Sequence, residues 1–270
     1  MADMARSEQK SVLHAKAVIV TGGASGIGNA TCRALAREGA HVVVVDVTRE
    51  KVDSTLEEVR SLSVHGDAHL GLVLDVRDEA AMASMADGTL SKFGSIDALV
   101  ASAGVLRGTG SSPKPLAQIS TAEWDQVLDT NLKGTFLSNR AVLPAMIRQR
   151  SGDIVNISSV SGKQGRAHDS PYCASKFGIN GMSESLAEEV RPYGIRVQIV
   201  MPDAVNTPIW NQNGPVPCPP DALPPERVAD LIVYLLKQPP DTVLGGVTIA
   251  PMRARRRRQK RKDGDHANGQ

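Results

Sequence analysis

The stretch AVIVTGGASGIG at residues 17–28 decides the fold, because an apolar run of strand length passes directly into a glycine-rich turn. Glycines at positions 22, 26 and 28 permit a tight turn and bring the backbone close to a pyrophosphate. The N-terminus of a helix that follows such a turn attracts negative charge. The stretch therefore predicts a strand, a phosphate-binding loop and a helix, in that order.

The alternation of strand and helix continues along the chain and predicts one doubly wound α/β sheet. Ligands bind such sheets beyond the carboxyl ends of the strands. Continuous apolar runs, typical of strands covered on both faces, occupy residues 17–21, 41–46, 70–75, 98–102, 153–158 and 196–201. Periodic stretches predict helices at 29–38, 50–62, 78–93, 122–149, 170–191 and 227–236, before a last short strand at 247–249.

The length of 270 residues suits one domain, which we expect at 15–252, after an N-terminal tail at 1–14. No apolar run reaches the roughly 18 residues of a membrane span, and the first residues are polar. We therefore expect a cytoplasmic protein without membrane contact. The three cysteines lack CxxC spacing, so neither disulfides nor a metal site is expected.

The C-terminal residues 253–270 form a separate, basic tail. They hold eight basic and two acidic side chains, so the preceding residues carry a net charge of −4. A solvated, disordered tail is the simpler interpretation, because a run of like charges cannot bury itself. Nucleic-acid contact through counterion release is the alternative.

Proline is concentrated at residues 202–225, where it occupies eight positions. Because proline disfavours regular helix, this segment predicts a loop at one edge of the site. We interpret it as a lid over the substrate.

Asp46 stands eighteen residues beyond Gly28, at the end of the second predicted strand. A carboxylate there accepts hydrogen bonds from the adenosine ribose and repels a 2′-phosphate, so NAD(H) is favoured over NADP(H). A helix cap or solvated turn residue is the alternative role for Asp46. Arg49 follows three residues later and could meet a 2′-phosphate, which is the main argument against a preference for NAD(H).

Tyr172 and Lys176 lie four residues apart at the beginning of a predicted helix, which places them one turn apart on the same face. An ammonium beside a phenol favours the phenolate, so we expect a lowered pKa for Tyr172. Ser158 and Ser159 end a buried strand and face the same crevice.

The whole pattern resembles the classical short-chain dehydrogenase/reductase family over roughly residues 15–250. The family's TGxxxGIG stands at residues 21–28 and its YxxxK at 172–176, with a serine, Ser159, thirteen residues before the tyrosine. Asn131 matches the family's catalytic asparagine, and Asp75 with Val76 matches the pair that contacts adenine. The resemblance implies a Rossmann-type three-layer sandwich with a mostly parallel seven-stranded sheet.

The family also implies a role for each matching residue. Tyr172 is the acid/base, and Lys176 lowers its pKa and holds the nicotinamide ribose. Ser159 hydrogen-bonds the reacting oxygen, and Asn131 holds a water that links Lys176 to solvent. Thr207 contacts the carboxamide of the nicotinamide. The implied cofactor-binding set is Gly22, Ser25, Gly26, Ile27, Gly28, Asp46, Asp75, Val76, Ala103, Gly104, Tyr172, Lys176, Pro202, Val205 and Thr207.

Two positions depart from the family pattern. Ser102 replaces an asparagine that braces the sheet, and Asp203 replaces a glycine near the nicotinamide. Asp203 either turns outward or repels acidic substrates. Residues that could line the substrate pocket are Leu106, Arg107, Ser161, Gln164, Arg166, His168, Ile209 and Trp210, although Arg166 and His168 are the type more often found on the surface.

The expected function is NAD(H)-dependent hydride transfer between nicotinamide and a secondary alcohol or ketone, in a homodimer or homotetramer. A 3-oxoacyl-thioester reductase is the nearest alternative and requires a basic patch near the lid. A sensor or scaffold that binds NAD without turnover is another alternative, but such a protein would not need Tyr172, Lys176 and Ser159. A nucleic-acid binder would act through the basic tail at residues 253–270.

Overall fold

A parallel β-sheet organises the part of the chain that the structure, a computed structural model, describes: residues 11–63, 68–108 and 110–252. Its seven strands follow the order β3-β2-β1-β4-β5-β6-β7, and every neighbouring pair is parallel. The prediction of a mostly parallel seven-stranded sheet is confirmed. The strands are β1 (Ala17–Thr21), β2 (His41–Asp46), β3 (Leu70–Val73), β4 (Ala98–Ala101), β5 (Gly152–Ile157), β6 (Ile195–Pro202) and β7 (Gly246–Ile249).

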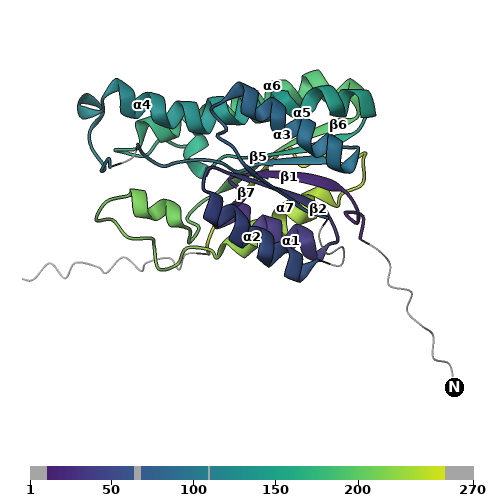
Figure 1. Ribbon diagram of the computed structural model, residues 1–270. Coiled ribbons are helices and arrows are strands. Elements are labelled where there is room, and N and C mark those ends of the chain that lie inside the picture. Colours follow the sequence, from purple (N-terminus) through teal and green to yellow (C-terminus); the bar gives the residue numbers. More distant parts are fainter. Residues whose placement is uncertain (1–10, 64–67, 109, 253–270) are drawn as a thin grey trace, which may run out of the picture.

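Helices cover both faces of this sheet, which gives the expected three layers (Figure 1). One layer holds α1 (Gly26–Arg37), α2 (Arg49–Leu62) and α7 (Pro225–Leu236). The other holds α3 (Glu79–Phe93), α4 (Thr121–Leu128), α5 (Gly134–Gln149) and α6 (Ser170–Val190).

The apolar runs fill two cores, because successive strand side chains point to opposite faces of the sheet. Val18 and Val20 belong to the cluster beneath α1, α2 and α7, whereas Ile19 belongs to the cluster beneath α3 and α5. All three side chains are fully buried. Each contributes about 1.5–3 kcal/mol of hydrophobic stabilisation, so an uninterrupted apolar strand is what a doubly covered sheet requires.

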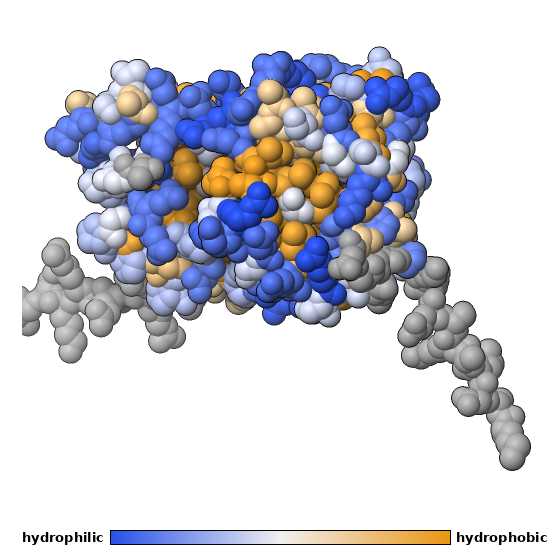
Figure 2. All heavy atoms as spheres, viewed as in Figure 1, coloured by the Kyte–Doolittle hydropathy of each residue, from blue (hydrophilic) through white to orange (hydrophobic). Residues whose placement is uncertain are grey.

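The outer strand β3 is covered less completely than the central strands. All four of its residues are partly exposed. Figure 2 shows apolar surface between the two helical layers on the face that it presents.

Two predicted segments differ in detail from the structure. The single helix predicted at 122–149 is interrupted by a π-helical segment, Asp129–Lys133, which joins α4 to α5. The proline-rich segment contains a short 3₁₀ helix, Pro208–Gln212, because proline is tolerated at the first position of a helix. A bridge between Val205 and Leu223 also closes this segment into a loop.

The strand order reverses between β1 and β4, and the loops after these strands meet there. Gly22 has φ +63°, and a Cβ atom added to it would lie 2.7 Å from Cα of Ala103. Only glycine permits this contact, since it lacks a side chain and adopts positive φ without strain. The crevice at the switch point therefore depends on the glycine loop.

Within the described ranges, no helix combines the length and the apolar character that a bilayer crossing requires. The predicted tail at 253–270 and residues 1–10 of the predicted N-terminal tail lie outside the described residues.

Gly28→Ala is expected to lower the melting temperature by several degrees. The new Cβ would lie 2.0 Å from the carbonyl oxygen of Gly22, so α1 must move away from the loop, and such overpacking costs about 1–3 kcal/mol. Gly181→Ala in α6 is the matched control. It has open space around it and should stabilise the protein by about 0.5–1 kcal/mol. Equal melting temperatures for the two variants would contradict this account.

Candidate active site

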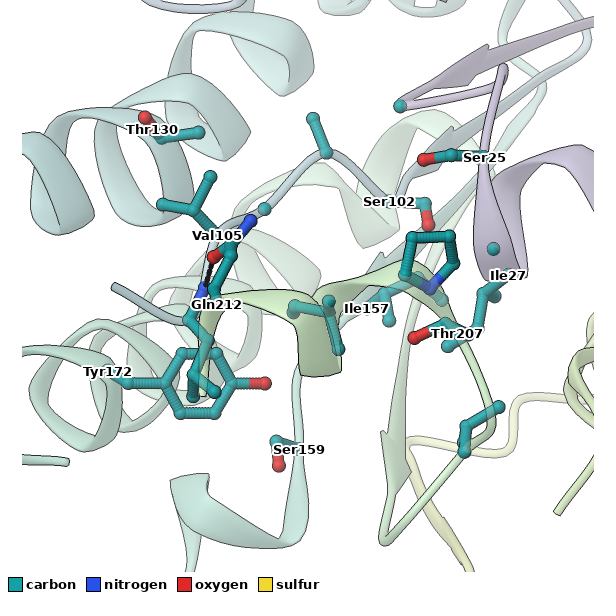
Figure 3. Close-up of a pocket in the computed structure, with 18 of the residues that line it drawn as sticks. Ser25, Ile27, Ser102, Val105, Thr130, Ile157, Ser159, Tyr172, Thr207 and Gln212 are labelled. Carbon is teal, nitrogen blue, oxygen red and sulfur yellow. Dashed lines mark hydrogen bonds between the residues drawn. The ribbon is translucent and has the colours of Figure 1, made fainter. Parts of the chain in front are cut away.

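A pocket of about 820 Å³ opens at the carboxyl ends of the strands, where the sequence places the ligand site. Its volume falls within the roughly 300–1,000 Å³ of small-molecule and cofactor sites. Figure 3 shows Ser25, Ile27 and Thr207 on one side and Tyr172 and Ser159 on another. The pocket is lined by every predicted catalytic and cofactor-binding residue except Gly28 and Asn131.

The N-terminus of α1 faces this pocket through the glycine loop. Ser25 precedes the helix, and its hydroxyl makes no capping bond to the backbone. The first turn contains no acidic side chain, so nothing there competes with a bound anion for the positive end of the helix dipole. The loop is therefore suited to a pyrophosphate.

Asp46 ends β2 at the edge of the pocket. Its Oδ2 accepts a hydrogen bond from the backbone N–H of Ala24 at 3.2 Å, and its Oδ1 accepts one from the backbone N–H of Val47 at 2.8 Å. These bonds fix the carboxylate beside the glycine loop. Lys51 and Arg77 are basic side chains that line the pocket, whereas Arg49, which the sequence suggested could meet a phosphate, does not line it.

Asp75, expected to contact adenine, is paired with Arg77. Both carboxylate oxygens accept hydrogen bonds from the guanidinium, at 2.7–3.1 Å. These bonds hold the pKa of Asp75 below its usual range. The adjacent Val76 is buried and also lines the pocket. The Asp75 carboxylate is therefore charged where it lines the pocket, and Arg77 sets its orientation.

The structure brings Tyr172, Ser159 and Lys176 together. Lys176 is buried, donates a hydrogen bond from Nζ to the carbonyl oxygen of Ile157 at 2.9 Å and lies 5.6 Å from the centre of the Tyr172 ring. The Ser159 hydroxyl accepts a hydrogen bond from the Ser161 N–H at 3.1 Å. The ends of β5 and α6 thus place a phenol, a hydroxyl and an ammonium at one end of the pocket.

The expectation of a lowered pKa for Tyr172 is contradicted by the structure, whereas a lowering effect of Lys176 stays a prediction. Burial raises the pKa of Tyr172 to about 12, and this effect outweighs the lowering by a hydrogen bond with Ser159. Burial also lowers the pKa of Lys176 to about 8. The cause is desolvation, which disfavours each charged form and which no spacing of residues reveals.

Asn131 lies in the π-helical segment and is fully buried. Its side-chain oxygen accepts a hydrogen bond from the Val105 N–H, and its amide donates to the Val105 carbonyl and to Ser175. The side chain therefore braces the loop after β4 against α6. Its predicted part in holding a water beside Lys176 stays a prediction.

Ser102 and Asp203, the two residues that depart from the family pattern, lie at different places in the pocket. Ser102 lies at the switch point, where its N–H donates to the Thr21 carbonyl and its side chain faces the pocket (Figure 3). Asp203 does not turn outward: it lines the pocket and accepts a 2.8 Å hydrogen bond from Arg166. Arg166 is likewise a pocket residue, not only a surface one.

The candidate substrate residues separate into two groups. Leu106, Ser161, Arg166, Ile209 and Trp210 line the pocket, whereas Arg107, Gln164 and His168 do not. The pocket also contains polar residues that the sequence did not predict, among them Lys51, Arg77, Gln126, Thr130, Asp169, Gln212 and Asn213. No motif marks these positions. For Asp169 alone a signal existed, since it lies three residues before Tyr172.

Fold and pocket together define a dinucleotide-binding oxidoreductase. Residues 16–215 match the family model described as short chain dehydrogenase. The chain belongs to the short-chain dehydrogenase/reductase family and is an NAD(P)-dependent oxidoreductase that transfers hydride between nicotinamide and alcohol or ketone substrates.

Curated relatives and solved structures agree with this assignment. The chain is 36% identical to a 3-oxoacyl-[acyl-carrier-protein] reductase of Thermotoga maritima, over 87% of this chain and 96% of the relative. It is 37% identical to a levodione reductase of Leifsonia aquatica, over 72% and 71%. A crystal structure of levodione reductase superimposes with a TM-score of 0.80 at 31% identity, covering 88% of this chain and 96% of that one. A metagenomic short-chain oxidoreductase in complex with NADP gives 0.76 at 34% identity, covering 90% and 100%.

Lys176→Met should change how stability depends on pH. Because the pKa of Lys176 is about 8 in the folded protein and 10.5 ordinarily, the unfolded chain binds an extra proton between these values. The free energy of unfolding of the wild type therefore rises with pH across this window, relative to the variant, by roughly 1.4 kcal/mol per pH unit. Denaturant unfolding at pH 8 and pH 10 measures the difference. The exposed Lys163, which does not line the pocket, offers a control, Lys163→Met, that should keep the wild-type dependence. Identical pH dependence in all three proteins would contradict the burial argument.

Proposed function

We propose that this protein is an NAD(H)-dependent oxidoreductase for a neutral secondary alcohol or ketone, with Tyr172, Ser159 and Lys176 as its reacting-end residues. The observation that carries the proposal is a single pocket with these three side chains at one end and Asp46 at the other. We propose further that residues 15–252 form one domain and that residues 202–225 are its substrate lid.

The residues at hand fit a nicotinamide dinucleotide, which when bound would supply or accept the hydride. The glycine loop and α1 would hold its pyrophosphate, Asp46 its adenosine ribose, and Lys176 its nicotinamide ribose. Val205 and Thr207, with Pro202, would border the nicotinamide, and Ala103 and Gly104 the centre of the cofactor. Asn131 does not line the pocket itself but holds the loop after β4, which carries Ala103 and Gly104.

Tyr172 and Ser159 handle the substrate oxygen. In carbonyl reduction the Ser159 hydroxyl donates a hydrogen bond to that oxygen, and Tyr172 transfers its phenolic proton to it as the carbon accepts hydride. In alcohol oxidation the phenolate takes the hydroxyl proton as hydride leaves the carbon. Because the pKa of Tyr172 is about 12, the phenol is protonated near neutral pH, which is the form that reduction requires. A positively charged nicotinamide would lower this pKa and favour oxidation.

The preference for NAD(H) rests on Asp46, whose fixed carboxylate meets a ribose hydroxyl but repels a phosphate. Lys51 opposes it, since an ammonium at the same end of the pocket attracts a phosphate. We give Asp46 the larger weight because two backbone N–H groups orient it toward the glycine loop.

A 3-oxoacyl-thioester reductase is the second candidate, and the Thermotoga maritima relative favours it. The lid sequence speaks against it, because residues 202–225 contain two aspartates and neither lysine nor arginine. The phosphates of a carrier or coenzyme would need the opposite charge. A screen of alcohols, ketones and acetoacetyl-CoA with all four nicotinamide cofactors, followed by absorbance, separates the two.

We also propose a homodimer or homotetramer. Its support is a largely apolar groove beside α4, α5 and α6, which Leu132, Phe136 and Met182 help to line. Phe136 is 43% exposed, and Phe177, the neighbour of Gly178 in this groove, is 47% exposed. A monomer in analytical ultracentrifugation would contradict this.

Tyr172→Phe should lower kcat by about 10²-fold or more, since it removes the proton that general acid catalysis transfers. Binding of NADH, followed by its fluorescence, should survive. Tyr193→Phe, at an exposed tyrosine outside the pocket, is the matched control and should keep wild-type rates. Near-normal turnover in Tyr172→Phe would overturn the assignment of the acid/base.

Asp46→Ser should lower the ratio of kcat/KM with NAD(H) to that with NADP(H) by about tenfold or more, because a 2′-phosphate no longer meets a nearby negative charge. Asp53→Ser on α2 changes an exposed aspartate outside the pocket and should leave the ratio unchanged. A wild-type enzyme that already prefers NADP(H) would refute the role given to Asp46.

A further inference from the structure

Arg107 is a buried cation that the proposed chemistry does not use. It follows β4, and only 9% of its side chain is exposed. Its Nη1 donates a hydrogen bond to the His168 carbonyl at 2.6 Å, and its Nη2 donates to Asp169 at 2.5 Å and to Asn213 at 2.9 Å. A buried guanidinium is tolerated only where such partners compensate it, so its position is tightly determined.

These partners belong to two different segments around the pocket. His168 and Asp169 immediately precede α6, whose first turn carries Tyr172, and Asn213 belongs to the lid. The backbone of the same loop is tied to the lid a second time, because the Gln212 side chain accepts hydrogen bonds from the N–H groups of Leu106 and Arg107 at 2.7 and 3.3 Å. Figure 3 shows Gln212 beside Val105 of this loop. Asp169, Gln212 and Asn213 all line the pocket.

We propose that Arg107 is a positioning residue that latches the lid to the start of the helix carrying Tyr172. One guanidinium then controls both how closely the lid covers the pocket and where the phenol points. The kinetic consequences rest on the proposed function, whereas the latch itself is a property of the chain.

Arg107 also balances charge beside the phenol. Asp169 raises the pKa of Tyr172 through its negative charge, and Arg166 lowers it. Arg107 offsets Asp169, so its loss should make proton removal from Tyr172 harder. The charged or titratable groups that face Tyr172 are Arg166, Asp169, Cys173 and Lys176, with Asp203 behind Arg166.

The chain supplies a matched control in Arg196. Its pair with Asp153 shows almost the same exposure as the Arg107–Asp169 pair, 9% and 19% against 9% and 18%. Arg196 likewise donates to backbone carbonyls, at 2.7–3.1 Å. It stands near the beginning of β6, at the edge of the sheet opposite the pocket. Arg107→Gln and Arg196→Gln therefore remove equivalent buried charges at opposite ends of the strands.

Arg107→Gln should lower kcat/KM about tenfold or more, since small misplacements of reacting groups cost up to ~100-fold. The pH at which the oxidation rate rises should also move upward. Arg196→Gln should lower the melting temperature and leave both kinetic quantities unchanged. Arg107→Lys should restore the pH profile but not KM, because an ammonium cannot make the forked bonds. Equal effects of the Arg107→Gln and Arg196→Gln changes would reduce Arg107 to a structural residue and overturn the proposal.

A second readout works without any substrate. Trp210 lies in the lid, so in a Trp124→Phe background its fluorescence reports lid closure. Arg107→Gln should increase acrylamide quenching of the Trp210 fluorescence by about twofold. Asn213→Ala, which removes only the bond between Arg107 and the lid, should do the same. Unchanged quenching in both variants refutes the latch, even if the enzyme is active. If quenching increases in these variants but the wild type shows no activity in the screen of alcohols and ketones, the proposed function is refuted and the latch is still supported. Should Arg107→Gln not fold, Arg107→Lys and Asn213→Ala decide the question.

Discussion

The close approach of the loops after β1 and β4 is the constraint on which the site depends. A side chain at Gly22 would collide with the backbone of Ala103, so the crevice forms only because this position has none. Parallel strands bring all their carboxyl ends to one edge of the sheet, and the reversal of strand order opens a gap between the loops there. The glycine loop supplies one wall of that gap and the loop after β4 the other.

Burial sets the chemistry at the reacting end. Removing Tyr172 and Lys176 from water disfavours both charged forms, which raises one pKa and lowers the other. The protein thereby keeps a neutral phenol beside an ammonium that is close to losing its proton. This arrangement costs folding free energy, as buried charges generally do, and it explains why stability and activity should make opposite demands at Lys176.

Two ion pairs stand beside the pocket near Tyr172. Asp203 is paired with Arg166, and Asp169 with Arg107. Such pairing provides orientation and not a strong field, which agrees with the neutral substrate that we propose. In the latch that we propose, Arg107 joins the segment 202–225 to the start of α6, which would couple substrate access to the position of Tyr172.

The sequence by itself determined the strands, the glycine loop and the positions of Asp46, Tyr172 and Lys176, because these depend on local periodicity and short spacing. The tertiary structure alone decided the partners of Arg107, which lie 62 and 106 residues away in Asp169 and Asn213, and the direction in which Asp203 points. It also decided the pKa of Tyr172. Desolvation and long-range pairing depend on which segments meet in space, and no local pattern encodes that meeting.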